Sequence, residues 1–454
     1  MQYAPFVPYW PPMHLTSLSF LYVFLPFSLA IYYMVPVRRR AAALLVISLV
    51  YLMLSQPGAI LLMLCSVLID YLLARAISHP DTPPLLRMLC LAGGIVKNTC
   101  LFFYACAQIG SPRYPALLGL RIYSLSGIDA LLCFYKGERR CPKHPLPFFL
   151  YALFFPRLYC GPLEPYENFS PQIAEIHPSA GLMATGLRVY LIGVVKQVLL
   201  GARLGQIYSS ASALAAEQST VLSCWIMVIS LALYTYFMFS GYADIAQGLG
   251  NLFGLSMPGQ FYYPYQSHSI HNFFDRFLMT FTDFIKRRVC APLTHRFPSR
   301  AMDGATLLLA GVLLGSWFGL TANTLLWGLC IGVFLVLERY AYPQLLKEIP
   351  ALFRRLATLA IVFGSFSLLC TSTLQESRAL FSGMVFLSSL DFFNNTILYI
   401  ASSNRLLLLA AGISCISAGK LLLDWLSQSA PRLARALLAG ATCLLFFLAT
   451  ATQL

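Results

Sequence analysis

Residues 239–293 read FSGYADIAQGLGNLFGLSMPGQFYYPYQSHSIHNFFDRFLMTFTDFIKRRVCAPL, and this stretch decides the fold. Its first residues complete an uncharged run from Gln218 to Ala243. That run is long enough to cross a bilayer, whose core requires about 20 apolar residues per helix. The remainder mixes aromatic, polar and basic residues, so we expect Tyr262 to Leu293 to form short tilted or re-entrant helices beside the span.

The composition of the whole chain is that of an integral membrane protein. Of its 454 residues, 58% are hydrophobic and 11% are charged, and the mean hydropathy is +0.71. Soluble domains carry about 25% charged residues. Further uncharged runs are Leu15 to Val35, Ala41 to Ile69, Ala305 to Leu337, Ala357 to Gln375 and Ala436 to Leu454. We predict an all-α, polytopic helical bundle of about eleven spans, because a membrane barrel would show period-two alternation.

The formal charge of +14 indicates how the chain is oriented in the membrane rather than nucleic-acid binding. Basic residues gather at the ends of apolar runs, as in Arg38–Arg40 and Lys286–Arg288. Positive residues concentrate in cytoplasmic loops and contact anionic lipid head groups. We therefore expect membrane lipids as partners, no nucleic acid, and one membrane domain over residues 1–454. The cysteines form no CxxC pair, and we predict no metal site.

Four further segments carry a family resemblance when they are taken in chain order. They are Tyr135–Glu138 (YKGE), Phe154–Pro162 (FFPRLYCGP), Phe169–Gln172 (FSPQ) and Trp317–Gly328 (WFGLTANTLLWG). With the stretch 239–293, they resemble the membrane-bound O-acyltransferase family, in its alginate O-acetylase and D-alanyl-teichoic-acid transfer branch. The resemblance extends over nearly the whole chain, and residues 234–332 are its core. It implies a bundle around a central tunnel.

The resemblance also implies acyl transfer to a hydroxyl, a reaction that requires a proton-accepting group. Histidine suits this role because its unperturbed pKa is about 6.5. The family carries one histidine after a W-R-R-W motif and another in a W-H-G motif. The matching positions here are Leu278 and Phe318, so this chain is a divergent member that lacks both family histidines.

Three other side chains are weak candidates for a relocated base. His271 lies two helical turns before Leu278, about 10 Å along a helix axis, and the alternative is that it caps a short helix. Asp275 is the second candidate, and the alternative is an ion pair with its neighbour Arg276. Asp244 is an intramembrane carboxylate, which by default indicates function. Its alternative is a buried hydrogen bond to backbone donors.

The resemblance places four more residues in a substrate tunnel, namely Arg276, Trp317, Asn323 and Trp327. Asn323 has an equally open alternative, since polar side chains also join membrane helices by hydrogen bonds. The neighbouring glycines, such as Gly315 and Gly328, are expected to allow close helix packing. Lys286–Arg288 is expected at the cytoplasmic rim, either near a phosphorylated acyl donor or as ordinary positive-inside anchoring.

Two hypotheses follow for function, and whether the chain is an enzyme stays open between them. The first is a degenerate inner-membrane protein of cell-surface polysaccharide acylation or export, acting as a scaffold or acyl conduit. The second is an active O-acyltransferase that moves an acyl group from a thioester to a hydroxyl with His271 or Asp275 as base. Both imply an acyl thioester as a substrate, no bound cofactor, and a periplasmic acyltransferase or polysaccharide-synthesis partner. A transporter would show inverted repeats, and we find none.

Overall fold

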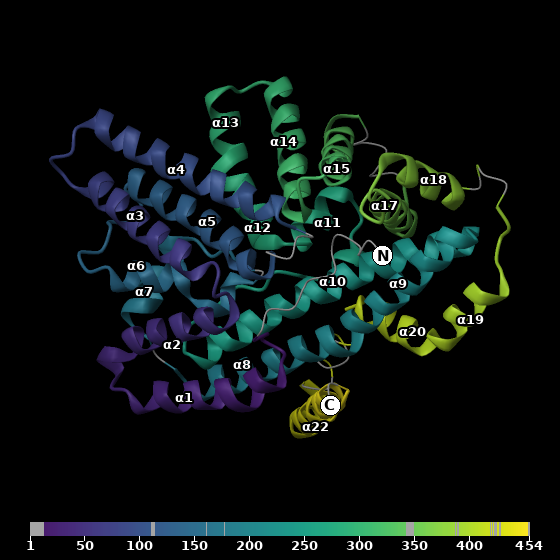
Figure 1. Cartoon of the computed structure of the whole chain (residues 1–454), viewed down its shortest axis with the longest axis horizontal. Coiled ribbons are helices and arrows are strands. Elements are labelled where there is room, and N and C mark those ends of the chain that lie inside the picture. The colour runs from purple at the N-terminus through teal and green to yellow at the C-terminus, as the bar shows by residue number, and fades with distance from the viewer. Residues whose placement is uncertain are drawn as a thin grey trace.

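The computed structural model is a helical bundle built around one long, buried helix (Figure 1). It describes residues 13–452 apart from 110–113, 160, 177, 342–348, 386, 388–389, 418, 420, 422–424 and 426–427. The chain thus has the predicted all-α, multi-pass membrane architecture.

The helices fall into four groups along the chain. The first group is α1 (Leu25–Met34), α2 (Arg40–Ser55), α3 (Ile60–Ser78), α4 (Pro84–Ala107) and α5 (Tyr114–Tyr135). The second is α6 (Leu146–Leu153), α7 (Tyr166–Ala174), α8 (Ala180–Val195), α9 (Ala202–Glu217) and α10 (Val221–Leu252). The third is α11 (Ile270–Arg276), α12 (Met279–Ile285), α13 (Ala291–Arg296), α14 (Arg300–Phe318) and α15 (Ala322–Tyr340). The fourth is α17 (Ala351–Phe366), α18 (Leu374–Met384), α19 (Asn395–Ser403), α20 (Arg405–Ser414) and α22 (Pro431–Ala451).

Helix α10 is the core of the bundle. It begins at a capping box in which Thr220 and Ser223 satisfy each other's backbone N–H groups. In its most apolar stretch, 78% of the residues are buried, against 28–44% in the other candidate spans. It packs against α8, α9, α17 and α18 and runs diagonally through the centre of Figure 1. A helix that is apolar on all sides is buried by its neighbours, and here those neighbours are other helices.

The number of long spans is lower than the eleven expected. Within the described part of the chain, six helices are long and apolar enough to cross a membrane, or seven if α19 and α20, bent by 57°, form one broken span. Two predicted runs fold as the shorter apolar helices Phe20–Met34 and Ala436–Ala451. The first ends just before Pro36, because a proline disfavours helical geometry in the residue before it.

The region from Tyr262 to Leu293 forms short helices, as expected. Helices α11 and α12 have seven residues each and are separated by Phe277 and Leu278. The α14–α15 pair that follows is joined by glycines. A Cβ built on Gly328 would lie 2.3 Å from the carbonyl oxygen of Gly311, so the two backbones are in direct contact, as predicted for these glycines.

Candidate functional site

Leu278, which the resemblance matches to the first family histidine, lies at the break between α11 and α12. Its backbone is left-handed, with φ of 53°, and its side chain is fully buried. The backbone around the break is held by hydrogen bonds, since Tyr262 N donates to Arg276 O and Met279 N to Gln260 O. Histidine is enriched in this conformation, whereas a bulky apolar residue is a rare occupant. The local backbone is therefore one that a histidine would tolerate better than the leucine present.

The second position, Phe318, is the last residue of α14 and is also buried. Its ring contacts the rings of Phe239 from α10 and Trp327 from α15, with centroids 5.8 and 5.1 Å apart. The ring of the preceding residue, Trp317, lies tilted by 40° against that of Phe281 of α12, with the centroids 4.7 Å apart. Both family positions are thus occupied by apolar side chains inside the bundle, next to the contact between α12 and α14.

His271 and Asp275 form an ion pair one helical turn apart on α11. His271 Nε2 lies 3.5 Å from Asp275 Oδ2, and the side chains are 47% and 36% exposed. Asp275 also pairs with Lys286. The capping alternative for His271 is wrong, since Ser269 caps α11. The ion-pair alternative for Asp275 is realised, but its partner is Lys286 rather than Arg276. The Arg276 guanidinium instead lies over the Tyr262 ring, 5.7 Å from its centroid.

Asp244 is bound by a cation rather than by backbone donors. Its Oδ2 accepts a hydrogen bond of 2.6 Å from Lys196 Nζ. Lys196 begins a wide helical turn, Lys196–Gly201, between α8 and α9. Such turns are frequent at functional sites. Here the turn brings the ammonium group of Lys196 to the carboxylate, and this pairing explains a carboxylate within the bundle.

The remaining predicted tunnel residues make contacts between helices. Asn323 Nδ2 donates to Thr371 O at 2.8 Å and to Ser377 Oγ at 3.2 Å. Trp327 Nε1 donates to Ser365 Oγ at 3.1 Å. The open alternative for Asn323, helix joining, is therefore realised. The tunnel role of the set Arg276, Trp317, Asn323 and Trp327 stays a prediction.

The side chains of the basic stretch Lys286–Arg288 form ion pairs with acidic side chains of the protein. Arg288, whose side chain is 1% exposed, pairs with Asp129 at 2.8 Å and with Glu138 at 3.1 Å. Arg287 pairs with the same Asp129 at 3.1 Å. Both arginines are held by carboxylates of the bundle, and the expected anchoring or donor-binding role stays a prediction. Lys286 alone of the three lines the cavities described below.

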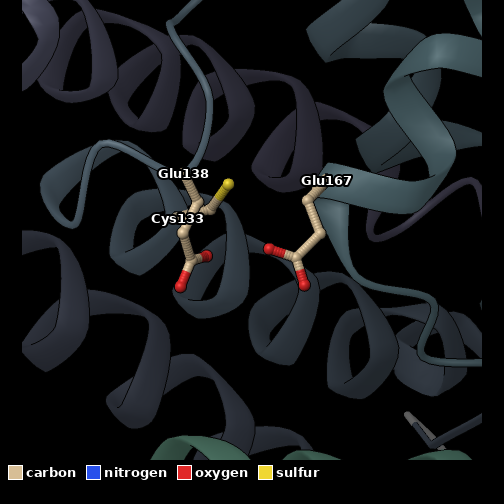
Figure 2. Close-up of side chains that lie close together, drawn as sticks. All are labelled: Cys133, Glu138 and Glu167. Carbon is tan, nitrogen blue, oxygen red and sulfur yellow. The ribbon is translucent and has the colours of Figure 1, made fainter.

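One group of side chains has the spacing of metal ligands. Cys133, Glu138 and Glu167 bring ligand atoms within 4.8 Å of one another, and Figure 2 shows the two carboxyl groups facing each other. Each carboxyl group also has an arginine partner, since Arg288 pairs with Glu138 and Arg287 with Glu167 at 3.4 Å. These pairs connect α7 and the turn after α5 to the basic stretch.

Two cavities lie beside the Asp275–Lys286 pair, and both residues line each of them. The Arg339 cavity, of about 380 Å³, is lined by His271 and by the ion pair of Asp303 with Arg339. The Glu164 cavity, of about 640 Å³, lies between the 163–172 segment, the 256–259 loop and α12. Both volumes fall in the range of small-molecule sites, about 300–1,000 Å³.

Glu164 is a site residue that the sequence reasoning missed. It lines the larger cavity and is 7% exposed. Its Oε1 accepts a hydrogen bond of 3.1 Å from Gln172 Nε2, whereas its Oε2 has no partner among the described residues. Burial raises its pKa from 4.5 to about 7. The one available signal was its place two residues after the F-F-P-x-x-x-x-G-P segment.

His14 is a second residue whose place the sequence did not reveal. It is buried in the bundle, and its Nε2 lies 2.5 Å from the Tyr242 hydroxyl of α10. Its Nδ1 lies 2.7 Å from Thr16 Oγ1 and 3.2 Å from Thr16 N. These contacts attach the segment before α1 to α10.

Comparisons with known proteins identify the family of this chain. The model of the membrane-bound O-acyltransferase family matches residues 135–374, which is more than half of the chain. A probable alginate O-acetylase of Azotobacter vinelandii is 25% identical over 345 residues, covering 72% of this chain and 69% of that protein.

Two further relatives, which are named for peptidoglycan and teichoic acid rather than for alginate, show similar identity to this chain. A peptidoglycan O-acetyltransferase of Helicobacter pylori is 25% identical over 55% of this chain, which spans 48% of that protein. A teichoic acid D-alanyltransferase of Bacillus subtilis is 23% identical over 57% of the chain and 69% of its own length. With the helical bundle and the family model in agreement, this chain belongs to the membrane-bound O-acyltransferase family.

Proposed function

We propose that this chain acts in the acylation of a cell-surface polysaccharide at a bacterial inner membrane, without histidine-based catalysis of its own. In that role it is a scaffold, or a conduit for an acyl group that comes from a thioester donor. Its partner would be a periplasmic acyltransferase or a polysaccharide-synthesis protein. The observation that carries the proposal is the burial of Leu278 and Phe318 among apolar and aromatic side chains.

The chemical argument concerns the missing proton acceptor. A hydroxyl attacks an acyl carbon efficiently only when a base removes its proton, and a positioned base contributes a factor of about 10² to 10⁴ in rate. Leucine and phenylalanine have no atom that accepts a proton. His14, a buried histidine, lies outside the two family positions, and its ring nitrogens lie 2.5 Å from the Tyr242 hydroxyl and 2.7 Å from Thr16 Oγ1.

The test is a transfer assay on the intact chain. The protein would be reconstituted in nanodiscs with radiolabelled acetyl-CoA and a hydroxyl-bearing polysaccharide. We expect neither transfer nor thioester hydrolysis above the protein-free rate. An alginate O-acetylase reconstituted in the same way is the positive control. Turnover by the wild-type chain, at a rate set by its concentration, would contradict the proposal.

A second candidate is an active O-acyltransferase with a relocated base. The specific observation in its favour is the His271–Asp275 pair, which lines the Arg339 cavity with the ring nitrogen 3.5 Å from the carboxylate. If the assay detects turnover, His271→Ala should abolish it. His79→Ala is a matched control, because His79 forms a similar exposed pair with Asp81 at 3.7 Å and does not line that cavity.

A further inference from the structure

The Glu164 cavity has an acidic lining in a basic chain. The chain carries 31 Lys and Arg residues against 17 Asp and Glu residues. The cavity is nevertheless lined by the three carboxyl groups of Glu164, Asp275 and Asp283 and by a single ammonium, that of Lys286. That ammonium is already paired with Asp275, and the Asp283 carboxylate lies 3.6 Å from Arg287 Nε. Among the described residues, Glu164 is thus the lining carboxylate that has no cationic group within ion-pair distance, and in its ionised form it attracts a cationic ligand.

Glu164 has the geometry of a ligand-binding group rather than of a structural one. Gln172 donates its Nε2–H to Glu164 Oε1, while Gln172 Oε1 accepts the backbone N–H of Ser256 at 2.8 Å. The amide is thus held from both ends and cannot turn to serve the other carboxylate oxygen. Glu164 Oε2 is left without a partner among the described residues, although the residue is only 7% exposed. Buried polar atoms are nearly always satisfied by protein, water or ligand.

We propose that the Glu164 cavity binds a small molecule, or the end group of a larger one, that carries a protonated amine. The ammonium donates to Glu164 Oε2, and Asp283 adds long-range attraction from the rim. Asn168 and Thr280, which also line the cavity, offer hydrogen-bonding groups to the rest of the ligand. The inference goes beyond the proposed function, and it requires binding only, so it holds or fails independently of thioester turnover.

The protonation of Glu164 gives the proposal a specific pH signature. Burial raises the pKa of Glu164 to about 7, although the nearby Arg157 guanidinium acts to lower it. An aliphatic amine, with a pKa of about 10, stays charged from pH 6 to 8. An ammonium binds the ionised carboxylate, so the affinity should rise about tenfold between pH 6 and 8 as Glu164 loses its proton. The other charged groups that line the cavity, Lys286, Asp275 and Asp283, are common to the wild type and the Glu164 variants.

The experiment compares two ligands that differ only in charge. The chain would be placed in phosphatidylcholine nanodiscs, which supply no primary amine, and titrated with 4-aminobutanol and with 1,4-butanediol by calorimetry or ligand-observed NMR. We expect binding of the amine, at least tenfold weaker binding of the diol, and a tenfold gain in amine affinity from pH 6 to 8. Glu164→Gln should reduce the amine affinity at pH 8 about tenfold and remove its pH dependence. Glu217→Gln, on the exposed end of α9, is the control and should change neither.

Further variants and outcomes keep the test decisive. Glu164→Asp keeps the charge and should retain the pH dependence of amine binding. Asp283→Asn should lower the amine affinity about threefold without altering its pH dependence. These two variants apply even if Glu164→Gln fails to fold. Equal affinities for amine and diol, a Glu164→Gln protein that binds as the wild type does, or displacement of the amine by acetyl-CoA would each overturn the inference.

Discussion

Leu278 and Asp275 are three residues apart, yet they belong to regions of opposite chemistry. Leu278 and Phe318 form an apolar centre, buried between α10, α12, α14 and α15. Asp275, Lys286 and the groups around Asp129 and Glu164 form a charged rim, in which most acids have a cationic partner. The left-handed break at Leu278 separates the two. The centre has lost the ionisable groups that the family resemblance implies, while the rim has kept a dense set of them.

The strongest test of this contrast is to restore histidine to the centre. In the double variant Leu278→His and Phe318→His, we expect acyl transfer to rise above the wild-type background by about 10² to 10⁴, the usual contribution of a positioned base. The measurement is the transfer assay described above. A matched control with asparagine at both positions is polar and tolerates the left-handed backbone, but it accepts no proton at neutral pH. Equal rates in the two double variants would mean that the centre has lost more than its bases.

At the rim, the largest stability effect is expected from Asp129. This carboxylate serves both Arg287 and the buried Arg288 and also accepts the backbone N–H of Tyr166. Asp129→Asn leaves a buried guanidinium without its closest charge partner, a change that costs about 3–5 kcal/mol. The melting temperature in detergent should fall by several degrees.

The control for that change is Asp81→Asn, because the Asp81 side chain is 88% exposed. We expect this variant to change stability by no more than about 0.5 kcal/mol. A similar loss in both variants would show that the rim charges contribute through net charge rather than through burial.

Glu164→Gln should change the pH dependence of stability. The pKa of Glu164 is raised in the folded chain, from 4.5 to about 7, so the folded state binds more protons than the unfolded state within that window. The wild type therefore loses stability as the pH rises from 4.5 to 7, by about 3 kcal/mol at roughly 1.4 kcal/mol per pH unit. Melting temperatures at pH 5 and pH 7.5 should differ less in Glu164→Gln than in the wild type. Parallel curves for the two proteins would contradict the prediction.

The fold followed from sequence because long apolar runs have few structural solutions in a bilayer. The run Gln218 to Ala243 predicted α10, and the aromatic and basic segment after it predicted the short helices α11 and α12. The span count did not follow, since the length of an apolar run does not reveal where its helix begins. The first run starts at Leu15, whereas its helix starts at Phe20.

The site was harder to predict because its contacts join residues far apart in the chain. Asp129 meets Arg288 across 159 positions, and His14 meets Tyr242 across 228. Neither pair has a local sequence signature. Glu164 escaped notice because its neighbours in sequence are apolar, and the cavity that it lines is built from three separate segments. The match of Leu278 and Phe318 to the family histidines stays a prediction, and residue type alone says only that these two side chains cannot accept a proton.

The smallest effect is expected where the rim is most exposed, at Asp275. Its side chain is 36% exposed, and its partners Lys286 and His271 are 46% and 47% exposed. Exposed ion pairs contribute about 0–1 kcal/mol, so Asp275→Asn should shift the melting temperature by less than Asp129→Asn at low salt, and added salt should remove the shift. If Asp275→Asn instead destabilised the chain as much as Asp129→Asn does, the pair between the two cavities would be a structural element. The ion pairs of Asp275 would then stabilise the fold as much as the ion pairs of Asp129 do.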